Sequence, residues 1–210
     1  MSSVRTTVVM CLAFVALILG LFYHSVTREP VLSVEELSEL GVFVLPRPRA
    51  LAEFELETHD GQAFTEASLQ GQWNLLFFGF TNCPDICPTS MAVMGQAART
   101  LEQAGEGTFR GILVSVDPER DLPEKLAAYA TAFHPDFIGV RGDIPELAEF
   151  GRQLNVAFAK VPDGAGGYTM DHTGNIVVIN PRGHYHGFIK MPHKADVLVQ
   201  TYRSLRGTVD

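Results

Sequence analysis

The sequence predicts an α/β domain, with a mixed central sheet flanked by helices, behind one N-terminal transmembrane helix. Three observations lead to this prediction. An uncharged apolar run lies near the start of the chain, short apolar runs then alternate with helical patterns, and a β-hairpin pattern comes near the end. Strands that alternate with helices form a sheet covered by helices on both faces.

The composition is that of a folded protein and excludes a disordered or disulfide-dense chain. The 210 residues are 46% hydrophobic and 19% charged, and the net charge is −8. A nucleic-acid-binding surface usually carries a basic excess or a basic stripe. The sequence has neither, so we expect no nucleic-acid partner.

Residues 1–27 are interpreted as a short cytoplasmic tail and a transmembrane anchor. Residues 8–23 are all apolar or glycine, and with Thr6 and Thr7 they would form a helix about 27 Å long, close to a ~30 Å hydrocarbon core. A cleaved signal peptide is the alternative, but it has a shorter apolar core and small residues at its end. Arg5 should keep the tail in the cytoplasm, so the rest of the chain is exported.

Residues 28–50 are interpreted as a linker, and residues 51–210 as one domain. Ser33 and Glu36 match a capping box that can begin a short helix. Two prolines near residue 47 then favour extended chain.

The first elements of the domain are a hairpin and a buried strand. Residues 54–58 alternate apolar and polar side chains before Asp60 and Gly61, which predicts a hairpin. Residues 73–80 are a continuous apolar run, typical of a strand buried on both faces. A helix is expected over residues 88–103.

The next elements repeat the strand-helix alternation. Residues 111–116 form a second buried strand, and residues 121–132 form a helix with Pro123 in its first turn. A short strand at 137–140 precedes a helix at 143–154.

The last elements are a hairpin and a helix. Residues 176–179 and 185–189 are antiparallel strands joined by a turn. The final helix covers residues 193–205, because its apolar residues fall on one face.

Two cysteines lie in the loop that follows the buried strand at residues 73–80. Cys83 and Cys87 are four residues apart, just before the helix that begins at Pro88. A thiolate near a helix N-terminus has a lowered pKa, which suits both redox exchange and metal binding. The spacing suits a disulfide or a shared metal ion. A purely structural disulfide is the remaining alternative, but it would close only a short loop.

A soft metal usually needs a third ligand, and His172 is the candidate. It lies just before the strand at 176–179, in a loop that should adjoin the cysteine loop. His184 and His186 share one face of the strand at 185–189 and are expected to form a polar outer face. The other histidines are expected to be solvated, to cap a helix or to lie at the membrane border: His24, His59, His134 and His193.

The chain resembles the Sco/SenC family of copper proteins, which are thioredoxin-like domains on a membrane anchor. The motifs that carry this resemblance are FFGFTNCPDICP at 77–88, SVDPERD at 115–121 and the DH pair that ends at His172. The resemblance implies that Cys83, Cys87 and His172 bind one copper ion. Two departures from the family pattern are Asn82, where histidine is common, and Thr173, where serine is common.

The chemistry of these side chains agrees with copper as Cu(I) and Cu(II). Two thiolates and one imidazole form a soft ligand set, which zinc would also accept. Asp171 is a candidate partner for the imidazole, because metal-bound histidines usually donate their other N–H to an acceptor. The alternative is that Asp171 is a turn residue. Asp117 and Asp121 are expected to cap and turn the chain near the site.

The resemblance implies a membrane-anchored copper chaperone in the bacterial inner membrane, with its domain in the periplasm. Such a chaperone would metallate the dinuclear copper centre of cytochrome c oxidase subunit II and could also reduce its cysteines. Its other partner would be an upstream copper donor or thiol reductant. The alternative function is a thiol–disulfide oxidoreductase without copper. Enzymes of that class use CxxC and a cis-proline, whereas this chain has CxxxC and no proline at 167–174.

Overall fold

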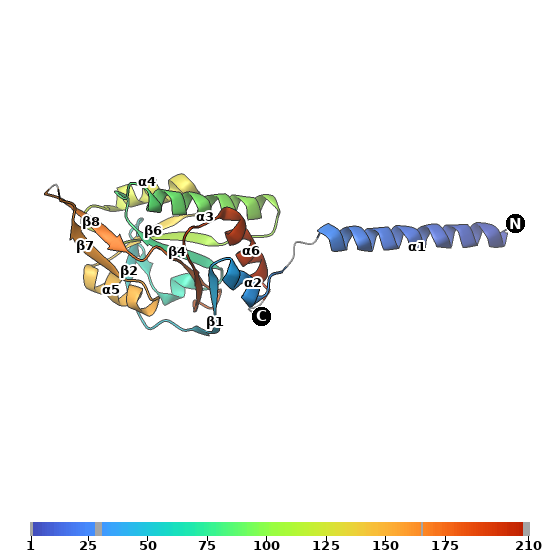
Figure 1. Cartoon of the computed structure of the whole chain (residues 1–210), viewed down its shortest axis with the longest axis horizontal. Coiled ribbons are helices and arrows are strands. Elements are labelled where there is room, and N and C mark those ends of the chain that lie inside the picture. Colours follow the sequence, from blue (N-terminus) through green and yellow to red (C-terminus); the bar gives the residue numbers. More distant parts are fainter. Residues whose placement is uncertain (1, 28–30, 165, 208–210) are drawn as a thin grey trace. The chain divides into compact units, whose positions relative to one another are not determined.

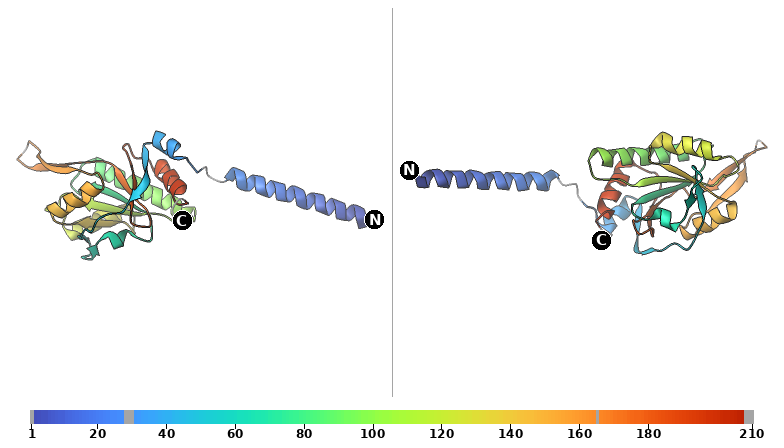
Figure 2. Two further views of the ribbon diagram at one scale, coloured as in Figure 1. Left: turned by 90° about the horizontal axis from the view of Figure 1, so that it is seen from below. Right: turned by 180° about the vertical axis from the view of Figure 1, so that it is seen from behind.

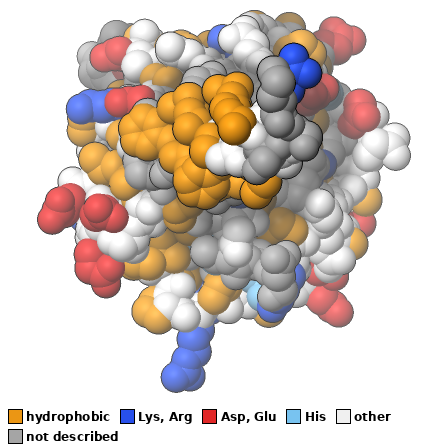
Figure 3. Space-filling model, turned by 90° about the vertical axis from the view of Figure 1, so that its right-hand side faces the viewer, with side chains coloured by type: hydrophobic (Ala, Val, Ile, Leu, Met, Phe, Trp, Pro, Cys, Tyr) orange, Lys and Arg blue, Asp and Glu red, His pale blue; other side chains and the backbone are white. Residues whose placement is uncertain are grey.

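The structure is a computed structural model that describes residues 2–27, 31–164 and 166–207. The chain divides into two units, residues 1–31 and residues 32–210. The first contains one helix, α1 (Ser2–Thr27). Its segment Val4–Phe22 is long and apolar enough to cross a membrane, a test that a signal sequence also passes. Hydrophobic side chains gather on this helix in the foreground of Figure 3.

The second unit is built on an eight-stranded mixed sheet (Figure 1) with the order β1-β10-β9-β4-β5-β6-β2-β3. Strands β4, β5 and β6 are parallel, whereas β9 and β10 are antiparallel to their neighbours. The strands of this sheet are β1 (Val42–Arg49), β2 (Leu56–Thr58), β3 (Ala63–Phe64), β4 (Asn74–Gly79), β5 (Arg110–Ser115), β6 (Ile138–Arg141), β9 (Ile176–Ile179) and β10 (Tyr185–Ile189).

Helices cover both faces of this sheet, as predicted. Helices α3 and α4 pack against the central strands on one face, and α6 packs on α3. On the other face, Phe150 of α5 contacts Phe78 of β4, with ring centroids 5.8 Å apart. The helices of this unit are α2 (Val34–Glu39), α3 (Ile86–Gln103), α4 (Pro123–Phe133), α5 (Ile144–Gln153) and α6 (Ala195–Leu205), with a short 3₁₀ turn at Glu66–Leu69.

The core lies on both sides of strand β4. All six residues of β4 are buried, which agrees with the prediction from its continuous apolar run. Successive side chains of a strand point to opposite faces. Phe78 therefore faces α5, while Phe77 faces the side where α3 begins.

A second, two-stranded sheet is formed by β7 (Phe158–Pro162) and β8 (Tyr168–His172). Figure 2 shows this β7–β8 hairpin extending beyond the main sheet in both views. The sequence analysis treated residues 167–174 as a loop. That interpretation is wrong, because the backbone from Tyr168 to His172 pairs with β7 in antiparallel register.

The interpretation of residues 28–50 as a linker also needs correction. Ser33 does cap a helix, α2, through the predicted capping box with Glu36. The following residues are not free chain, because β1 pairs with β10 and forms an edge of the main sheet. Proline is tolerated in an edge strand, so Pro46 and Pro48 did not prevent strand formation.

Candidate metal centre

The two cysteines lie where β4 turns into helix α3. Cys87 is in the first turn of α3 and fully buried, whereas Cys83 precedes the helix and is half-buried. Both are free thiols. The backbone N–H of Cys87 points at the Cys83 Sγ atom, 3.5 Å away. Gly79 makes room for the inner cysteine, because a Cβ atom there would lie only 2.9 Å from the Cys87 Sγ atom.

His172, the last residue of β8, meets the buried cysteine. Its Nε2 atom lies 3.6 Å from the Cys87 Sγ atom. Its Nδ1 atom lies 3.2 Å from the Thr173 carbonyl oxygen. A carbonyl can only accept, so Nδ1 carries the proton and the Nε2 lone pair faces the sulfur. The rings of Phe77 and Phe80 pack nearly perpendicular to the imidazole, with centroid distances of 5.8 and 6.0 Å.

Burial favours the uncharged forms of Cys87 and His172. It raises the pKa of the Cys87 thiol above its usual range, with smaller contributions from Cys83 and Asp121. It lowers the pKa of His172, an effect that outweighs the Thr173 carbonyl and the Asp171 charge. A metal ion that binds here must therefore displace the thiol proton, and it meets an imidazole that is already neutral.

The spacing of these atoms suits a metal ion. A tetrahedral ion with bonds of ~2.3 Å to sulfur and ~2.05 Å to nitrogen separates those atoms by about 3.6 Å, which is the separation of the Cys87 and His172 atoms. Cys83 and His172 also line one cavity of about 140 Å³. Cys87 and His172 are thus in contact, and Cys83 borders the same cavity as His172, but the donor atoms of all three do not lie within 4.8 Å of one another. Their soft donors fit copper.

Asp171 lies beside this site, but the geometry favours a different partner for the imidazole. Asp171 is exposed, and neighbouring residues of a strand point to opposite faces. The Thr173 carbonyl occupies the hydrogen-bonding position at Nδ1 of His172. A backbone carbonyl gives no sequence signal, so the residue pattern alone could not have identified it.

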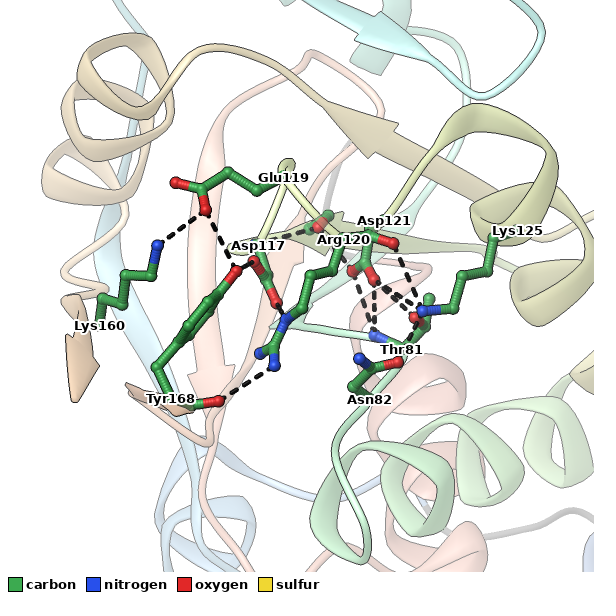
Figure 4. Close-up of polar contacts among 10 residues, drawn as sticks. Thr81, Asn82, Asp117, Glu119, Arg120, Asp121, Lys125, Lys160 and Tyr168 are labelled. Atoms are coloured by element: carbon green, nitrogen blue, oxygen red, sulfur yellow. Dashed lines mark hydrogen bonds and ion pairs between the residues drawn. The ribbon is translucent and has the colours of Figure 1, made fainter. Parts of the chain in front are cut away.

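The segment from Asp117 to Asp121 ties the cysteine loop to the rest of the domain (Figure 4). The buried Asp121 carboxylate accepts hydrogen bonds from the Thr81 N–H at 3.1 Å and the Thr81 hydroxyl at 2.5 Å. Lys125 lies 3.8 Å from the same carboxylate and donates to the Asn82 side chain at 2.6 Å. Asp117 also accepts backbone hydrogen bonds that turn the chain, through its carbonyl oxygen.

The same segment holds the strand that carries His172. Arg120 forms an ion pair with the buried Asp117 and donates to the Tyr168 carbonyl oxygen at 3.0 Å. Its guanidinium lies 3.9 Å from the centre of the Tyr168 ring and 5.8 Å from that of Phe80. Figure 4 shows Arg120 between Asp117 and Tyr168. Asp117 and Asp121 were predicted from the sequence to lie near the site, whereas Arg120 was not.

Other histidines differ from their predicted surroundings. His186 is buried against Trp73 and Asn180, so it does not lie on a polar outer face. His134 is buried beside Glu102, at 3.1 Å, rather than solvated. His193 precedes helix α6 and contacts the Ser90 hydroxyl at 2.9 Å, so it is neither a cap nor solvated.

Comparison with known proteins assigns this chain to a protein family. Residues 45–206 match the SCO1/SenC family. The mouse (Mus musculus) mitochondrial protein SCO2 homolog is 34% identical over 153 residues, which are 72% of this chain and 60% of that protein. The chain thus spans less than two thirds of the length of that relative.

Two solved structures show the same fold. The structure of Bradyrhizobium japonicum ScoI with copper bound has a TM-score of 0.64 and 34% sequence identity, covering 73% of this chain and 98% of that chain. The structure of BsSco, described as a member of the Sco family of cytochrome c oxidase assembly proteins with a disulfide switch, has a TM-score of 0.61 and 26% identity. It covers 80% of this chain and 99% of that chain.

Proposed function

Since the chain belongs to the SCO1/SenC family of copper-binding proteins linked to cytochrome c oxidase assembly, we propose that it is a membrane-anchored copper chaperone. Its domain is thioredoxin-like. The observation that carries the proposal is the 3.6 Å approach of the His172 Nε2 atom to the Cys87 Sγ atom. The two side chains are in contact although 85 residues separate them in the sequence.

Copper is the cargo of this protein, and three side chains hold it. Cys83 and Cys87 supply thiolates after their protons leave to solvent, and His172 supplies the Nε2 lone pair. The Thr173 carbonyl keeps the imidazole in the tautomer that binds metal. Because Cys83 is more exposed than Cys87, it is the cysteine of the pair that an incoming partner reaches first.

The recipient is cytochrome c oxidase subunit II, whose dinuclear copper centre this chain fills. Residues 1–27 anchor it in the bacterial inner membrane, with Arg5 on the cytoplasmic side and residues 51–210 in the periplasm. An upstream copper donor or thiol reductant restores the loaded, reduced form. The two thiols can also reduce the cysteines of the recipient, since a free dithiol exchanges with disulfides.

The test of this proposal is the substitution His172→Ala in the full chain, purified in detergent and kept reduced. Wild type should bind one copper per chain in competition with a chelator, and its Cu(II) form should absorb by thiolate charge transfer. Loss of a partner to a metal ligand weakens binding about 10–100-fold, so His172→Ala should cost at least that. The matched control is His184→Ala, on the hairpin between β9 and β10.

The second candidate function is a thiol–disulfide oxidoreductase, favoured by the contact between the half-exposed Cys83 and the buried Cys87. The same variant separates the two functions. In a deletion strain grown with scarce copper, a chaperone with His172→Ala should fail to restore oxidase activity, while an oxidoreductase should restore it. If His172→Ala equals wild type in copper affinity and in oxidase activity, the three-ligand site is refuted.

A further inference from the structure

A soft side chain outside the predicted ligand set lies at the candidate copper site. The cavity of about 140 Å³ that Cys83 and His172 line is also lined by Met191, from the loop between β10 and α6. No part of the sequence pattern that identified the cysteines and His172 includes this methionine. It reaches the cavity only because β10 ends beside the turn that follows His172.

Met191 lies at the outer side of this cavity. Its side chain is 47% exposed, whereas Cys87 is 0% exposed and Met170, which also lines the cavity, is 8% exposed. Cys83 and His172 are intermediate. The sulfur and nitrogen donors therefore form an ordered series, from exposed Met191 through Cys83 and His172 to buried Cys87.

Gly174 is what allows the Met191 sulfur to lie so close to the His172 turn. A Cβ atom on Gly174 would be 2.8 Å from the Met191 Sδ atom and 2.6 Å from its Cε atom. No left-handed backbone conformation requires glycine there. The thioether of Met191 thus occupies the space that a side chain at residue 174 would need, two residues from the candidate ligand His172.

A thioether in this place has a specific chemistry. It is neutral and soft, so it binds Cu(I) and discriminates against harder ions. Methionine is also unbranched and flexible, so its sulfur can bind an ion near solvent and then release it.

We propose that Met191 is the entry ligand for Cu(I). This inference rests on the proposed copper function. The step is a ligand exchange in which copper remains Cu(I). A Cu(I)–sulfur bond forms to Met191 as a bond to the donor breaks. Bonds to Cys83, Cys87 and His172 then form, the thiol protons pass to solvent, and the Met191 bond breaks.

The experiment measures the rate at which the reduced full chain, in detergent, takes Cu(I) from its bicinchoninate complex. Met191→Leu keeps the volume and removes the sulfur, and it should slow uptake about tenfold. The Cu(II) charge-transfer spectrum should not change. The control is Met94→Leu, a methionine in α3 that is fully buried in the core.

A second variant keeps the sulfur and moves it. Gly174→Ala should displace the Met191 side chain and slow uptake to a similar extent, and combining it with Met191→Leu should add no further slowing. Equal uptake rates in wild type and Met191→Leu would overturn the proposal, as would equal slowing in Met94→Leu. A wild-type chain that takes up no copper would instead refute the copper function itself.

Discussion

Gly79 shows how a single residue fixes the position of a candidate ligand. A Cβ atom there would lie 2.9 Å from the Cys87 Sγ atom and 3.0 Å from Cε1 of Phe77. Phe77 in turn packs its ring against His172. One methyl group at this position would therefore disturb both the sulfur and the support of the imidazole.

We expect Gly79→Ala to destabilise the domain by about 1–3 kcal/mol, the usual cost of overpacking a core. Its affinity for copper should also fall, and by more than the lower stability of the fold alone would explain. The control is Gly207→Ala, where an added Cβ meets no described atom within 4 Å. Denaturant unfolding and chelator competition measure the two effects. Wild-type copper affinity in Gly79→Ala would contradict the close packing at Cys87.

The sequence predicted individual site residues to different degrees. Cys83 and Cys87 could be identified from the local sequence, because two cysteines between a buried strand and a helix suit redox exchange or metal binding. His172 needed the order of the strands and the family resemblance. The error at His186 is instructive, since the predicted i, i+2 relation to His184 says which residues share a face but not whether that face is buried.

At the scale of elements, the β7–β8 hairpin is held by side chains rather than by the main sheet. Its strands pair only with each other among the described strands. Tyr168 at the start of β8 donates to Asp117 at 2.9 Å and stacks under Arg120. This cluster fixes the start of β8, while Phe77 and Phe80 pack against His172 at its end.

We expect Arg120→Lys to weaken copper binding while the domain stays folded. Lysine keeps the charge beside Asp117 but loses the planar group that stacks on Tyr168 and Phe80. Amide hydrogen exchange in β8 should speed up more than exchange in β4. Arg152→Ala is the control, because its ion pair with Glu149 lies on α5 and is exposed, and such pairs contribute ~0–1 kcal/mol. Unchanged exchange in β8 would argue against a positioning role for Arg120.

Elements were predicted well where burial imposes a pattern. The continuous apolar runs of β4, β5 and β9 are typical of strands with two covered faces. Strand β1 was missed because its two prolines suggested an unpaired segment. Only one edge of this strand is paired, and such a strand tolerates proline. The β7–β8 hairpin was missed because most of its side chains are exposed or partly exposed, so hydrophobic alternation is weak.

At the scale of the whole domain, buried histidines make stability depend on pH. Burial lowers the pKa of His172, His186 and His193. His186 lies in β10 and its Nδ1 atom contacts the Asn180 side-chain amide at 3.2 Å. The unfolded chain, with an ordinary histidine pKa of ~6.5, therefore binds more protons than the folded one in mild acid.

We expect the free energy of unfolding to be constant above about pH 7 and to fall as the pH drops through ~6.5. His186→Gln should flatten this dependence, because the amide cannot become charged. His184→Gln is the control, since His184 lies in the turn before β10 and is only partly buried. Thermal melts of the copper-free chain between pH 5.5 and 8 measure the slope. A wild-type melting temperature that rises towards pH 5.5 would reverse the predicted sign.

The division of the candidate ligands between two separately hydrogen-bonded sheets has a thermodynamic consequence. Cys83 and Cys87 follow a strand of the large sheet, whereas His172 ends a strand of the small one. Binding that uses all three couples the docking of the hairpin to the occupancy of the site, and such coupling is reciprocal. If docking of the hairpin raises the affinity for copper by some factor, bound copper raises the equilibrium constant for docking by the same factor. A partner that lifts the hairpin therefore loosens the cargo by the same free energy, without touching a ligand.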